Sequence, residues 1–343
     1  MAPSSIDQAI STDQWSDLSR YRPMPDIDLN RLHDYRLARI RASLEQAGAA
    51  MCMLVNPISL RYAVDYRTYG LFQSHIPTTY LFLAVEGPVV IHGVYGSPPR
   101  VDDSRPARPI SYFDGGPELD TNASLLAQDM DNYLREIGSD NRRVAVEFVN
   151  PSLTLALARR GLEVIDGAPV SEGARTIKSE DEIACMRWAI AVAELGIGKV
   201  RESIRPGVRE LQLWGLLNYT NLANNGDWHD GRMLASGPRI NPWLQEASPR
   251  LLESGDLVGL DTDMIGPFGY FADISRTFHC GPARPTRRQK QLYRYAVEEI
   301  EHNTRLVRPG ITLSEFQSQA LVQPEAFHQN AYTCVVHGVG MCD

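Results

Sequence analysis

Residues 259–278 read GLDTDMIGPFGYFADISRTF and place three aspartates in an otherwise apolar stretch. Asp261, Asp263 and Asp273 stand among leucine, methionine, isoleucine, phenylalanine and tyrosine residues, which are typical of buried β-structure. An unpaired carboxylate that is removed from water costs several kcal/mol, so buried carboxylates are paired or coordinate a cation. The stretch therefore predicts that the three aspartates share a partner.

The pattern of this stretch predicts a hairpin. LVGLDTDM (257–264) alternates with period two, so Asp261 and Asp263 would point to the same face of one strand. The following IGPFG supplies a turn, and YFADISRTF (270–278) supplies a return strand that would carry Asp273 opposite the other two. Three facing carboxylates repel one another, and a divalent cation or a pair of cations removes this repulsion.

A second interpretation fits Asp261 and Asp263 equally well when they are taken alone, as turn-formers that face water. Asp273 and a later histidine favour the metal site. Residues 331–343, AYTCVVHGVGMCD, predict a short strand, YTCVV, followed by His337 among glycines that let other groups approach the imidazole. A histidine at a strand end is more often structural than a ligand, but here the apolar strand and the glycines favour a ligand. Carboxylate oxygens with one imidazole suit Mn, Fe, Co or Zn.

The composition excludes several classes of protein. The chain has 343 residues, which suits two domains rather than one core. Its net charge of −8 is spread along the chain, and the small basic cluster at 287–290 is interpreted as a solvated helix start, so no nucleic-acid partner is expected. No apolar run approaches the ~20 residues that cross a membrane. The first 15 residues lack the basic and apolar regions of a secretory signal.

Five cysteines without a CxxC pair are interpreted as reduced thiols of a cytoplasmic protein. They are Cys52, Cys185, Cys280, Cys334 and Cys342. Cys334 and Cys342 flank His337, but their spacing matches no common zinc pattern. Small buried thiols are therefore the preferred interpretation.

Apolar runs and helical patterns divide the chain into three parts. Runs at 50–55, 79–85, 88–94, 143–148 and 162–166 predict strands, and patterns at 32–47 and 125–138 predict helices between some of them. The predicted parts are an irregular N-terminal arm (1–30), an α/β domain (31–168) and a domain that holds the aspartates (175–343). Residues 167–175, GAPVSEGAR, are the predicted linker.

Helical patterns also flank the aspartate stretch. Residues 179–204 fit a long helix with Ser179 at its N-cap and Glu182 three residues later, which is the capping-box pattern. Residues 208–225 predict a second helix, and residues 287–307 predict a third. The aspartate hairpin is therefore expected between helices of the second domain.

These motifs together resemble those of the M24, or pita-bread, metallohydrolases, which include methionine aminopeptidase, aminopeptidase P, prolidase and creatinase. The hairpin at 259–278 resembles their metal-binding hairpin, and HGVG (337–340) resembles their His-Gly-x-Gly ligand segment. Three further stretches resemble family motifs: VNPISLRYAVDYRTYG (55–70), ARTIKSEDEIACMRWAI (174–190) and SGPRINPWLQE (236–246). The resemblance implies an α/β fold with a creatinase-like N-terminal domain and a C-terminal pita-bread domain.

The resemblance to the family assigns metal ligation to Asp261 or Asp263, to Asp273 and to His337, and in the lyase branch described below all three aspartates bind metal. It implies a divalent metal pair of Fe, Mn, Co or Zn. Family members carry two further glutamate ligands, some tens of residues beyond the histidine. Because the 343 residues end before that point, the pita-bread domain is expected to be incomplete at its C-terminus and the chain to bind metal poorly. The family also implies a small-molecule substrate and a homodimer.

Three departures from the peptidase pattern favour another reaction. The DTD motif supplies two candidate ligands where the peptidases show one aspartate followed by x-Gly or x-Asn. Leu244 stands where the peptidases place a substrate-binding histidine, and Asp343 follows His337 by six positions. These features resemble a non-peptidase branch, the metal-dependent lyases that cleave dimethylsulfoniopropionate to dimethyl sulfide and acrylate.

In that branch a tyrosine and an aspartate near the ligand histidine act on the substrate, and they correspond to Tyr332 and Asp343. A β-elimination needs a base that removes the proton next to the carboxylate, and Asp343 is the candidate. Tyr332, Trp243 and Trp15 are candidates to receive the cationic group of the substrate, although each aromatic taken alone is more often a core residue. Two alternatives stay open: a Xaa-Pro aminopeptidase or dipeptidase, and a non-catalytic pita-bread binding protein.

Overall fold

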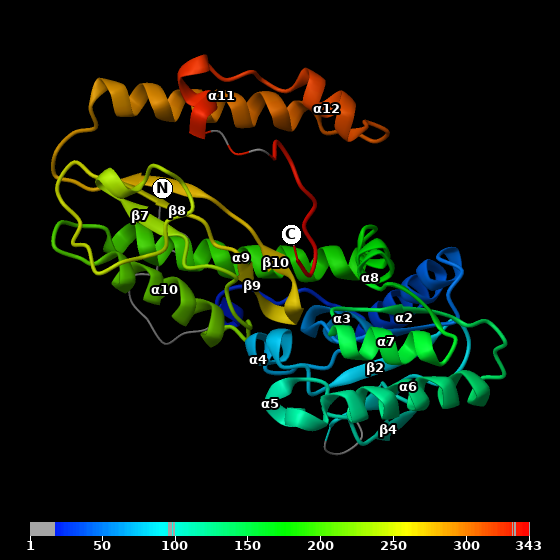
Figure 1. Cartoon of the computed structure of the whole chain (residues 1–343). Coiled ribbons are helices and arrows are strands. Elements are labelled where there is room, and N and C mark those ends of the chain that lie inside the picture. The colour runs from blue at the N-terminus through cyan, green and yellow to red at the C-terminus, as the bar shows by residue number, and fades with distance from the viewer. Residues whose placement is uncertain (1–17, 95–97, 99, 331, 333, 343) are drawn as a thin grey trace. The chain divides into compact units, whose positions relative to one another are not determined.

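The computed structural model describes residues 18–94, 98, 100–330, 332 and 334–342, which form two compact units (Figure 1). The N-terminal unit comprises Pro25–Cys185 together with Gly340–Cys342, and the C-terminal unit is built mainly from Met186–Val339. The boundary falls inside helix α9 (Glu180–Ser203). Each unit contains both helices and sheet, which confirms the predicted α/β class.

A six-stranded mixed sheet forms the centre of the N-terminal unit, with strand order β4-β3-β2-β1-β5-β6. The strands are β1 (Met51–Leu54), β2 (Tyr80–Ala84), β3 (Val90–His92), β4 (Asp103–Arg105), β5 (Arg143–Val146) and β6 (Glu163–Asp166). β2 pairs antiparallel with β1 and β3, whereas β1, β5 and β6 run parallel to one another. Every residue of β1 and β2 is buried, which explains their continuous apolar runs. The five predicted strands of this unit are confirmed.

The N-terminal unit also contains helices. They are α2 (Leu29–Gln46), α3 (Pro57–Val64), α4 (Gly70–His75), α5 (Tyr112–Gly115), α6 (Leu119–Glu136), α7 (Pro151–Arg159) and α8 (Ala168–Arg175). The side chain of Asp28 caps α2, because it accepts hydrogen bonds from the backbone N–H groups of Asn30 and Arg31. The buried residues of α6 and α7 belong to the same hydrophobic cluster as those of β1 and β5. The sheet and these two helices therefore share one core.

Helix α8 corrects the predicted linker at 167–175. Pro169 lies in the first turn, where its missing N–H would have no partner in any case, and Val170 and Ala174 are buried. α8 packs against α2 so closely that a Cβ atom at Gly173 would lie 3.3 Å from Oγ of Ser43. The glycine and proline in this segment thus mark a helix start and a close contact between helices.

The C-terminal unit contains a three-stranded antiparallel sheet, β11-β8-β7, and a separate two-stranded hairpin, β9-β10. The strands are β7 (Leu234–Ser236), β8 (Leu257–Leu260), β9 (Met264–Ile265), β10 (Phe271–Ala272) and β11 (Arg276–His279). Helix α10 (Glu210–Ala223) shares a hydrophobic cluster with β7 and β8. The predicted hairpin is therefore divided into two ladders, and the breaks fall at the aspartates.

The predicted helices of this region are confirmed. At the start of α9, the backbone N–H of Ser179 donates to Oε2 of Glu182 at 2.7 Å, and the backbone N–H of Glu182 donates to Oγ of Ser179 at 3.3 Å. This is the predicted capping box. α10 confirms the helix expected at 208–225, and α11 (Arg287–Leu306) confirms the helix expected at 287–307. α12 (Leu313–Gln319) follows it.

The strand predicted at 332–336 is wrong for the residues that the structure describes. Neither residue 332 nor any of residues 334–342 lies in a strand, and the side chains of Val335 and Val336 are exposed. A strand persists where a neighbour takes its backbone hydrogen bonds. None of the described strands pairs with this segment. His337 therefore stands in an extended segment rather than at a strand end.

The cysteines are free thiols, as predicted. Cys52, Cys185 and Cys280 are buried and Cys342 is partly buried, but Cys334 is exposed, which corrects the expectation of a buried thiol there. In the part of the chain that the structure describes, no helix combines the length and apolar character needed to cross a membrane.

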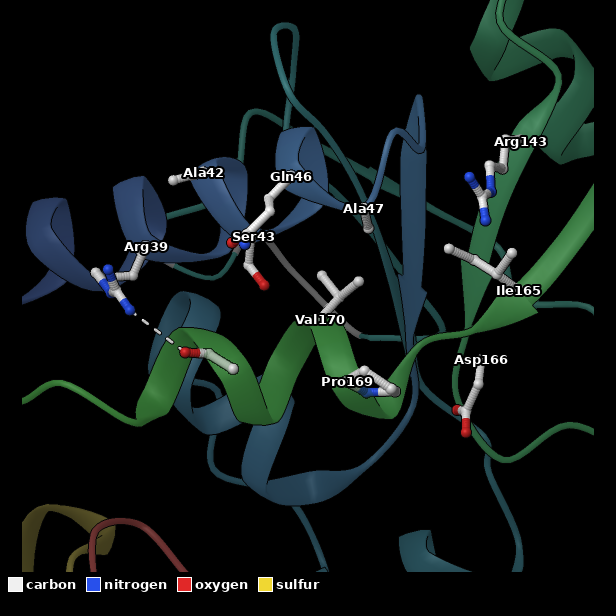
Figure 2. A pocket seen from close by; sticks show the side chains of 11 residues that line it. Arg39, Ala42, Ser43, Gln46, Ala47, Arg143, Ile165, Asp166, Pro169 and Val170 are labelled. Carbon is white, nitrogen blue, oxygen red and sulfur yellow. Dashed lines mark hydrogen bonds between the residues drawn. The ribbon is translucent and has the colours of Figure 1, made fainter. Parts of the chain in front are cut away.

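A cavity of about 520 Å³ lies within the N-terminal unit, between α2, α8 and the strands β5 and β6 (Figure 2). Arg39 and Ser43 of α2 line one side, and Val170 of α8 lines another. Gln46 of α2, Arg143 of β5 and Asp166 of β6 are further polar residues of its lining. None of the predicted metal ligands and substrate-binding residues that the structure describes lines this cavity.

Candidate metal centre

The structure brings together the three aspartates of the opening stretch. One carboxylate oxygen from each of Asp261, Asp263 and Asp273 lies within 4.8 Å of the other two. Asp261 and Asp263 belong to the break between β8 and β9, and Asp273 belongs to the break between β10 and β11. The carboxylates thus converge where the two ladders are interrupted.

Thr262 holds the two breaks together. Its side chain is fully buried, and its Oγ1 donates a hydrogen bond to the carbonyl of Ala272 at 2.5 Å. The same oxygen accepts a hydrogen bond from the backbone N–H of Ile274 at 3.0 Å. These are the backbone groups on either side of Asp273, so the Thr262 hydroxyl replaces the ladder hydrogen bonds that the break removes.

The loop before β7 supports the other side of the aspartate pair. The backbone N–H of Asp261 donates to the carbonyl of Met233 at 2.9 Å, and the backbone N–H of Asp230 donates to the carbonyl of Asp263 at 3.0 Å. Nδ1 of His229 lies 2.7 Å from the carbonyl oxygen of Thr262. Each residue of the DTD motif is therefore fixed through its own backbone.

The local backbone differs from the regular alternation predicted for this motif. Asp263 has a φ of 36°, in the left-handed region that aspartate and asparagine tolerate better than most residues. The two side chains still converge, but they do so because the strand breaks at Thr262. A continuous strand is not the cause of their common orientation.

His337, the fourth predicted ligand, contacts one member of this cluster. Its Nε2 is 3.2 Å from Oδ2 of Asp273. The His337 side chain is 41% exposed and the Asp273 side chain 17% exposed, so this contact is partly open to solvent. Three of the predicted metal ligands therefore lie together, and the fourth contacts one of them.

The electrostatics of the cluster suit a cation. Burial raises the pKa of Asp273 to about 7, and a hydrogen bond with Asp261 and the negative charges of Asp261 and Asp263 add to the rise, while His337 opposes it. A carboxyl group that holds its proton near neutral pH marks a surplus of negative charge. Three carboxylates and one imidazole form a donor set that suits a divalent cation such as Fe, Mn, Co or Zn.

The predicted substrate-binding and catalytic residues are less closely gathered. Trp243 is half-buried and packs against β8, because a Cβ atom at Gly259 would lie 3.3 Å from its Cζ3 atom. The ring of Tyr332 is exposed. Trp15 and Asp343 lie outside the described residues, so their roles stay predictions.

Glu210 is a residue that the sequence reasoning missed. Its buried carboxylate accepts hydrogen bonds from the backbone N–H and hydroxyl groups of Ser236 at 2.8 and 2.6 Å. It accepts the same pair of bonds from Ser248 at 3.0 and 2.7 Å, and it pairs with Arg239. In the sequence Glu210 looks like an ordinary acidic residue in the first turn of a helix, so only the fold reveals that it fixes the Ser236–Gly237 corner.

The chain is similar to proteins of the M24 family in sequence. Residues 184–343 match the family described as Metallopeptidase family M24. The chain is 32% identical over 327 residues to the dimethylsulfoniopropionate lyase DddP of Roseovarius nubinhibens, covering 92% of this chain and 73% of that protein. The lyase DddP of Roseobacter denitrificans has the same identity and coverage. A Xaa-Pro dipeptidase of Pyrococcus horikoshii is 29% identical over 170 residues, or 49% of this chain and 48% of that protein.

Solved structures share the fold. A Xaa-Pro dipeptidase from Bacillus anthracis matches with a TM-score of 0.66 and 20% identity, covering 84% of this chain and 76% of that chain. A prolidase from Pyrococcus furiosus matches with a TM-score of 0.64 and 19% identity, covering 88% of this chain and 83% of that chain.

The fold and the cluster define a pita-bread protein that carries an additional N-terminal α/β domain. Its aspartates lie at the breaks of the hairpin in the second unit. The chain belongs to the M24 metallopeptidase family.

Proposed function

We propose that the protein is a metal-dependent lyase that cleaves dimethylsulfoniopropionate to dimethyl sulfide and acrylate. The observation that carries this proposal is the convergence of a third carboxylate, Asp263, with Asp261 and Asp273. A surplus carboxylate is the feature in which the DTD motif departs from the peptidase pattern. The two DddP relatives, which match nearly the whole chain, support the same reaction.

In this proposal Asp261, Asp263, Asp273 and His337 hold a divalent metal pair of Fe, Mn, Co or Zn. When bound, a divalent cation there supplies a Lewis acid that can hold the carboxylate of the substrate and increase the acidity of the adjacent C–H bond. The carboxylates of the chain compensate the charge of the cation. The hydrogen bonds of Thr262 hold the two strand breaks that carry the aspartates in a fixed position relative to one another.

The reaction is a β-elimination. Asp343 is the proposed base, and its carboxylate takes the proton from the carbon next to the substrate carboxylate. The electron pair of that C–H bond forms the C=C bond of acrylate, while the C–S bond breaks and dimethyl sulfide leaves with its electron pair. Protons and charge balance, because the sulfonium charge disappears as the base becomes protonated.

The sulfonium group needs an uncharged partner that nevertheless attracts a cation. The exposed ring of Tyr332 can offer its face, five residues before His337 in the chain. Trp243 is half-buried and packs against Gly259 of β8, so we propose it as a weaker candidate than Tyr332. Trp15 stays a candidate from the sequence alone.

The test compares the two products that the alternative reactions would release. Purified protein, reconstituted with Fe²⁺, Mn²⁺, Co²⁺ or Zn²⁺, is incubated with dimethylsulfoniopropionate, and headspace chromatography measures dimethyl sulfide. Parallel samples receive Xaa-Pro dipeptides, and free proline is measured. We expect sulfide and no proline; proline without sulfide would instead establish the peptidase alternative.

The peptidase alternative has the solved structures of prolidases and dipeptidases in its favour, but these show the fold alone at their low identity. Leu244 opposes it, because it stands where the peptidases place a histidine. A non-catalytic binding protein is the second alternative. It predicts no bound metal after reconstitution, and metal analysis by mass spectrometry tests it.

We further propose that the protein is a cytoplasmic homodimer with domains at 31–168 and 175–343 that acts on a small molecule. Size-exclusion chromatography with light scattering tests the dimer. A mass of one chain at micromolar concentration would contradict it.

A further inference from the structure

The short segment Gly340–Cys342 is anchored in the N-terminal unit, although the histidine before it belongs to the C-terminal unit. Met341 is only 2% exposed. A Cβ atom at Gly340 would lie 2.9 Å from Cε of Lys178, so only glycine fits this approach without a shift of the lysine. The segment is therefore seated on the N-terminal unit by both burial and close contact.

Arg175 provides the polar part of this anchor. The residue lies at the C-terminal end of α8 and is 7% exposed. Its Nη2 donates a hydrogen bond to Sγ of Cys342 at 3.6 Å, and its Nη1 donates to Oγ of Ser59 at 3.2 Å. A single buried guanidinium thus joins the segment to α3.

The chain of contacts continues from Ser59 to the central sheet. The Ser59 hydroxyl donates to Oε1 of Glu147 at 2.7 Å. Oε2 of Glu147 accepts hydrogen bonds from the backbone N–H groups of Val55 and Asn56 at 2.9 and 3.0 Å. Glu147 directly follows β5, and Val55 directly follows β1, so the network ends at two neighbouring parallel strands.

Burying the charges of this network costs free energy unless each charged group has its hydrogen-bond partners. Arg175 and Glu147 are both buried charges, and Ser59 connects them as donor to one and acceptor from the other. A buried charge is tolerated where hydrogen bonds and an opposite charge compensate it. The thiol of Cys342 is the partner of the second guanidinium arm, so the segment completes the network that in turn holds it.

We propose that Arg175 is a positioning residue that fixes Gly340–Cys342, the segment that follows the proposed ligand His337 in the sequence. His337 precedes the anchored segment by three residues, and the proposed base Asp343 directly follows it in the sequence. The roles of those two residues rest on the proposed function, whereas the anchoring itself does not.

The first experiment measures the anchoring without any activity. Hydrogen exchange with mass spectrometry compares the wild-type protein, Arg175→Met and the control Arg39→Met. Arg39 is the matched control because it also donates to carbonyls of α8, those of Ala174 and Gly173 at 3.2 and 3.3 Å, and these bonds do not involve Gly340–Cys342. We expect amides of residues 338–342 to exchange at least about tenfold faster in Arg175→Met only. Equal exchange in all three proteins would overturn the proposal.

A second pair of variants covers the case in which Arg175→Met does not fold. Cys342→Val removes the acceptor of the Arg175 hydrogen bond, whereas Cys342→Ser keeps an acceptor at the same position. Faster exchange of residues 338–342 in Cys342→Val than in Cys342→Ser supports the anchor. The same rate in both variants would contradict it.

The second experiment separates positioning from mere stability. In the dimethyl sulfide assay, Arg175→Met should lower kcat about 10- to 100-fold with KM changed less than about threefold, and Arg175→Lys should restore part of kcat. Arg39→Met should leave both constants near their wild-type values. Faster exchange with an unchanged kcat would overturn the positioning role. If the wild-type protein releases no sulfide, the proposed function fails, and the exchange result alone decides whether the segment is anchored.

Discussion

The hydroxyl of Thr262 donates a hydrogen bond of 2.5 Å to the carbonyl of Ala272, the residue directly before Asp273. Thr262 itself stands between Asp261 and Asp263. The position of the third aspartate thus depends on the side chain that separates the other two. This relationship joins the two interrupted ladders of the hairpin at the point where the carboxylates meet.

Thr262→Val should therefore weaken both the fold and the metal site. Valine has nearly the same shape, but it leaves the Ala272 carbonyl and the Ile274 N–H without their partner in a buried place. We expect a loss of about 1–3 kcal/mol in the free energy of unfolding, measured by urea denaturation. Metal affinity, measured by calorimetric titration, should fall about 10- to 100-fold.

Thr262→Ser is the control for this prediction, because serine keeps the hydroxyl and loses only a methyl group. It should retain metal affinity within a few-fold of the wild-type value. If Thr262→Val and Thr262→Ser bind metal equally well, the hydroxyl is not what aligns the aspartates.

The raised pKa of Asp273 predicts how the metal-free protein responds to pH. Burial and the neighbouring aspartates raise this pKa from 3.8 to about 7, so the folded protein holds the proton more tightly than the unfolded chain does. The resulting contribution to stability is fully present below about pH 4 and is lost as the pH rises through about 7. With a chelator present, urea denaturation between pH 4 and 8 measures the free energy of unfolding. The contribution of Asp273 to it should decline over this range, while the contribution of other carboxylates rises.

Asp273→Asn isolates this contribution, because asparagine does not titrate. The difference in unfolding free energy between the wild-type protein and this variant should change with pH in the direction just stated. Protons also compete with a cation for the cluster, so metal affinity of the wild-type protein should increase as the pH rises towards and through 7. A metal affinity that does not change between pH 5 and 8 would contradict the raised pKa.

The sequence predicted most of the described helices and strands, and it singled out the three aspartates that the structure brings together and the histidine that contacts one of them. Long amphipathic patterns such as residues 179–204 and 287–307 show their periodicity without any tertiary information. The three aspartates were recognisable as candidate ligands because carboxylates in an apolar stretch need a partner, whatever the details of the strand.

The features that the sequence did not predict depend on contacts between residues that are distant in the chain. Thr262 looks like an ordinary strand residue, and its role appears only when Ala272 lies beside it. Residues 167–175 look like a linker, and they become a helix because α2 covers Val170 and Ala174. The strand expected at 332–336 has the correct apolar pattern, but a strand also requires a neighbour, which the pattern cannot supply.

Glu210 provides a test of the corner that follows β7. Burial alone would raise its pKa, but hydrogen bonds from Ser236 and Ser248 and the charge of Arg239 hold that pKa below its ordinary value of 4.5. Glu210→Gln removes the charge and two of the four acceptor positions. It should lower the free energy of unfolding by about 3–5 kcal/mol at neutral pH, because Arg239 then loses its buried partner.

Glu246→Gln is the matched control, since Glu246 pairs with Arg232 at 2.6 Å where both side chains are exposed. This change should cost about 1 kcal/mol or less. Because the pKa of Glu210 is lowered, its contribution is present above about pH 4.5 and is lost as the pH falls. The difference in unfolding free energy between Glu210→Gln and Glu246→Gln should therefore decrease at acidic pH. A difference that increases there would show that another group stabilises the corner.

The surplus carboxylate of the DTD motif gives the sharpest test of the reaction. Asp263→Asn removes one negative charge with almost no change of shape, and asparagine tolerates the φ of 36° at this position, whereas alanine would add backbone strain. The variant should bind metal more weakly, and the pKa of Asp273 should fall because one of the charges that raise it is gone. If the third carboxylate is required for elimination, release of dimethyl sulfide should fall at least about 100-fold while the fold, followed by circular dichroism, is retained. Sulfide release at the wild-type rate would mean that two aspartates and His337 suffice, and that the departure from the peptidase pattern at Asp263 does not select the reaction.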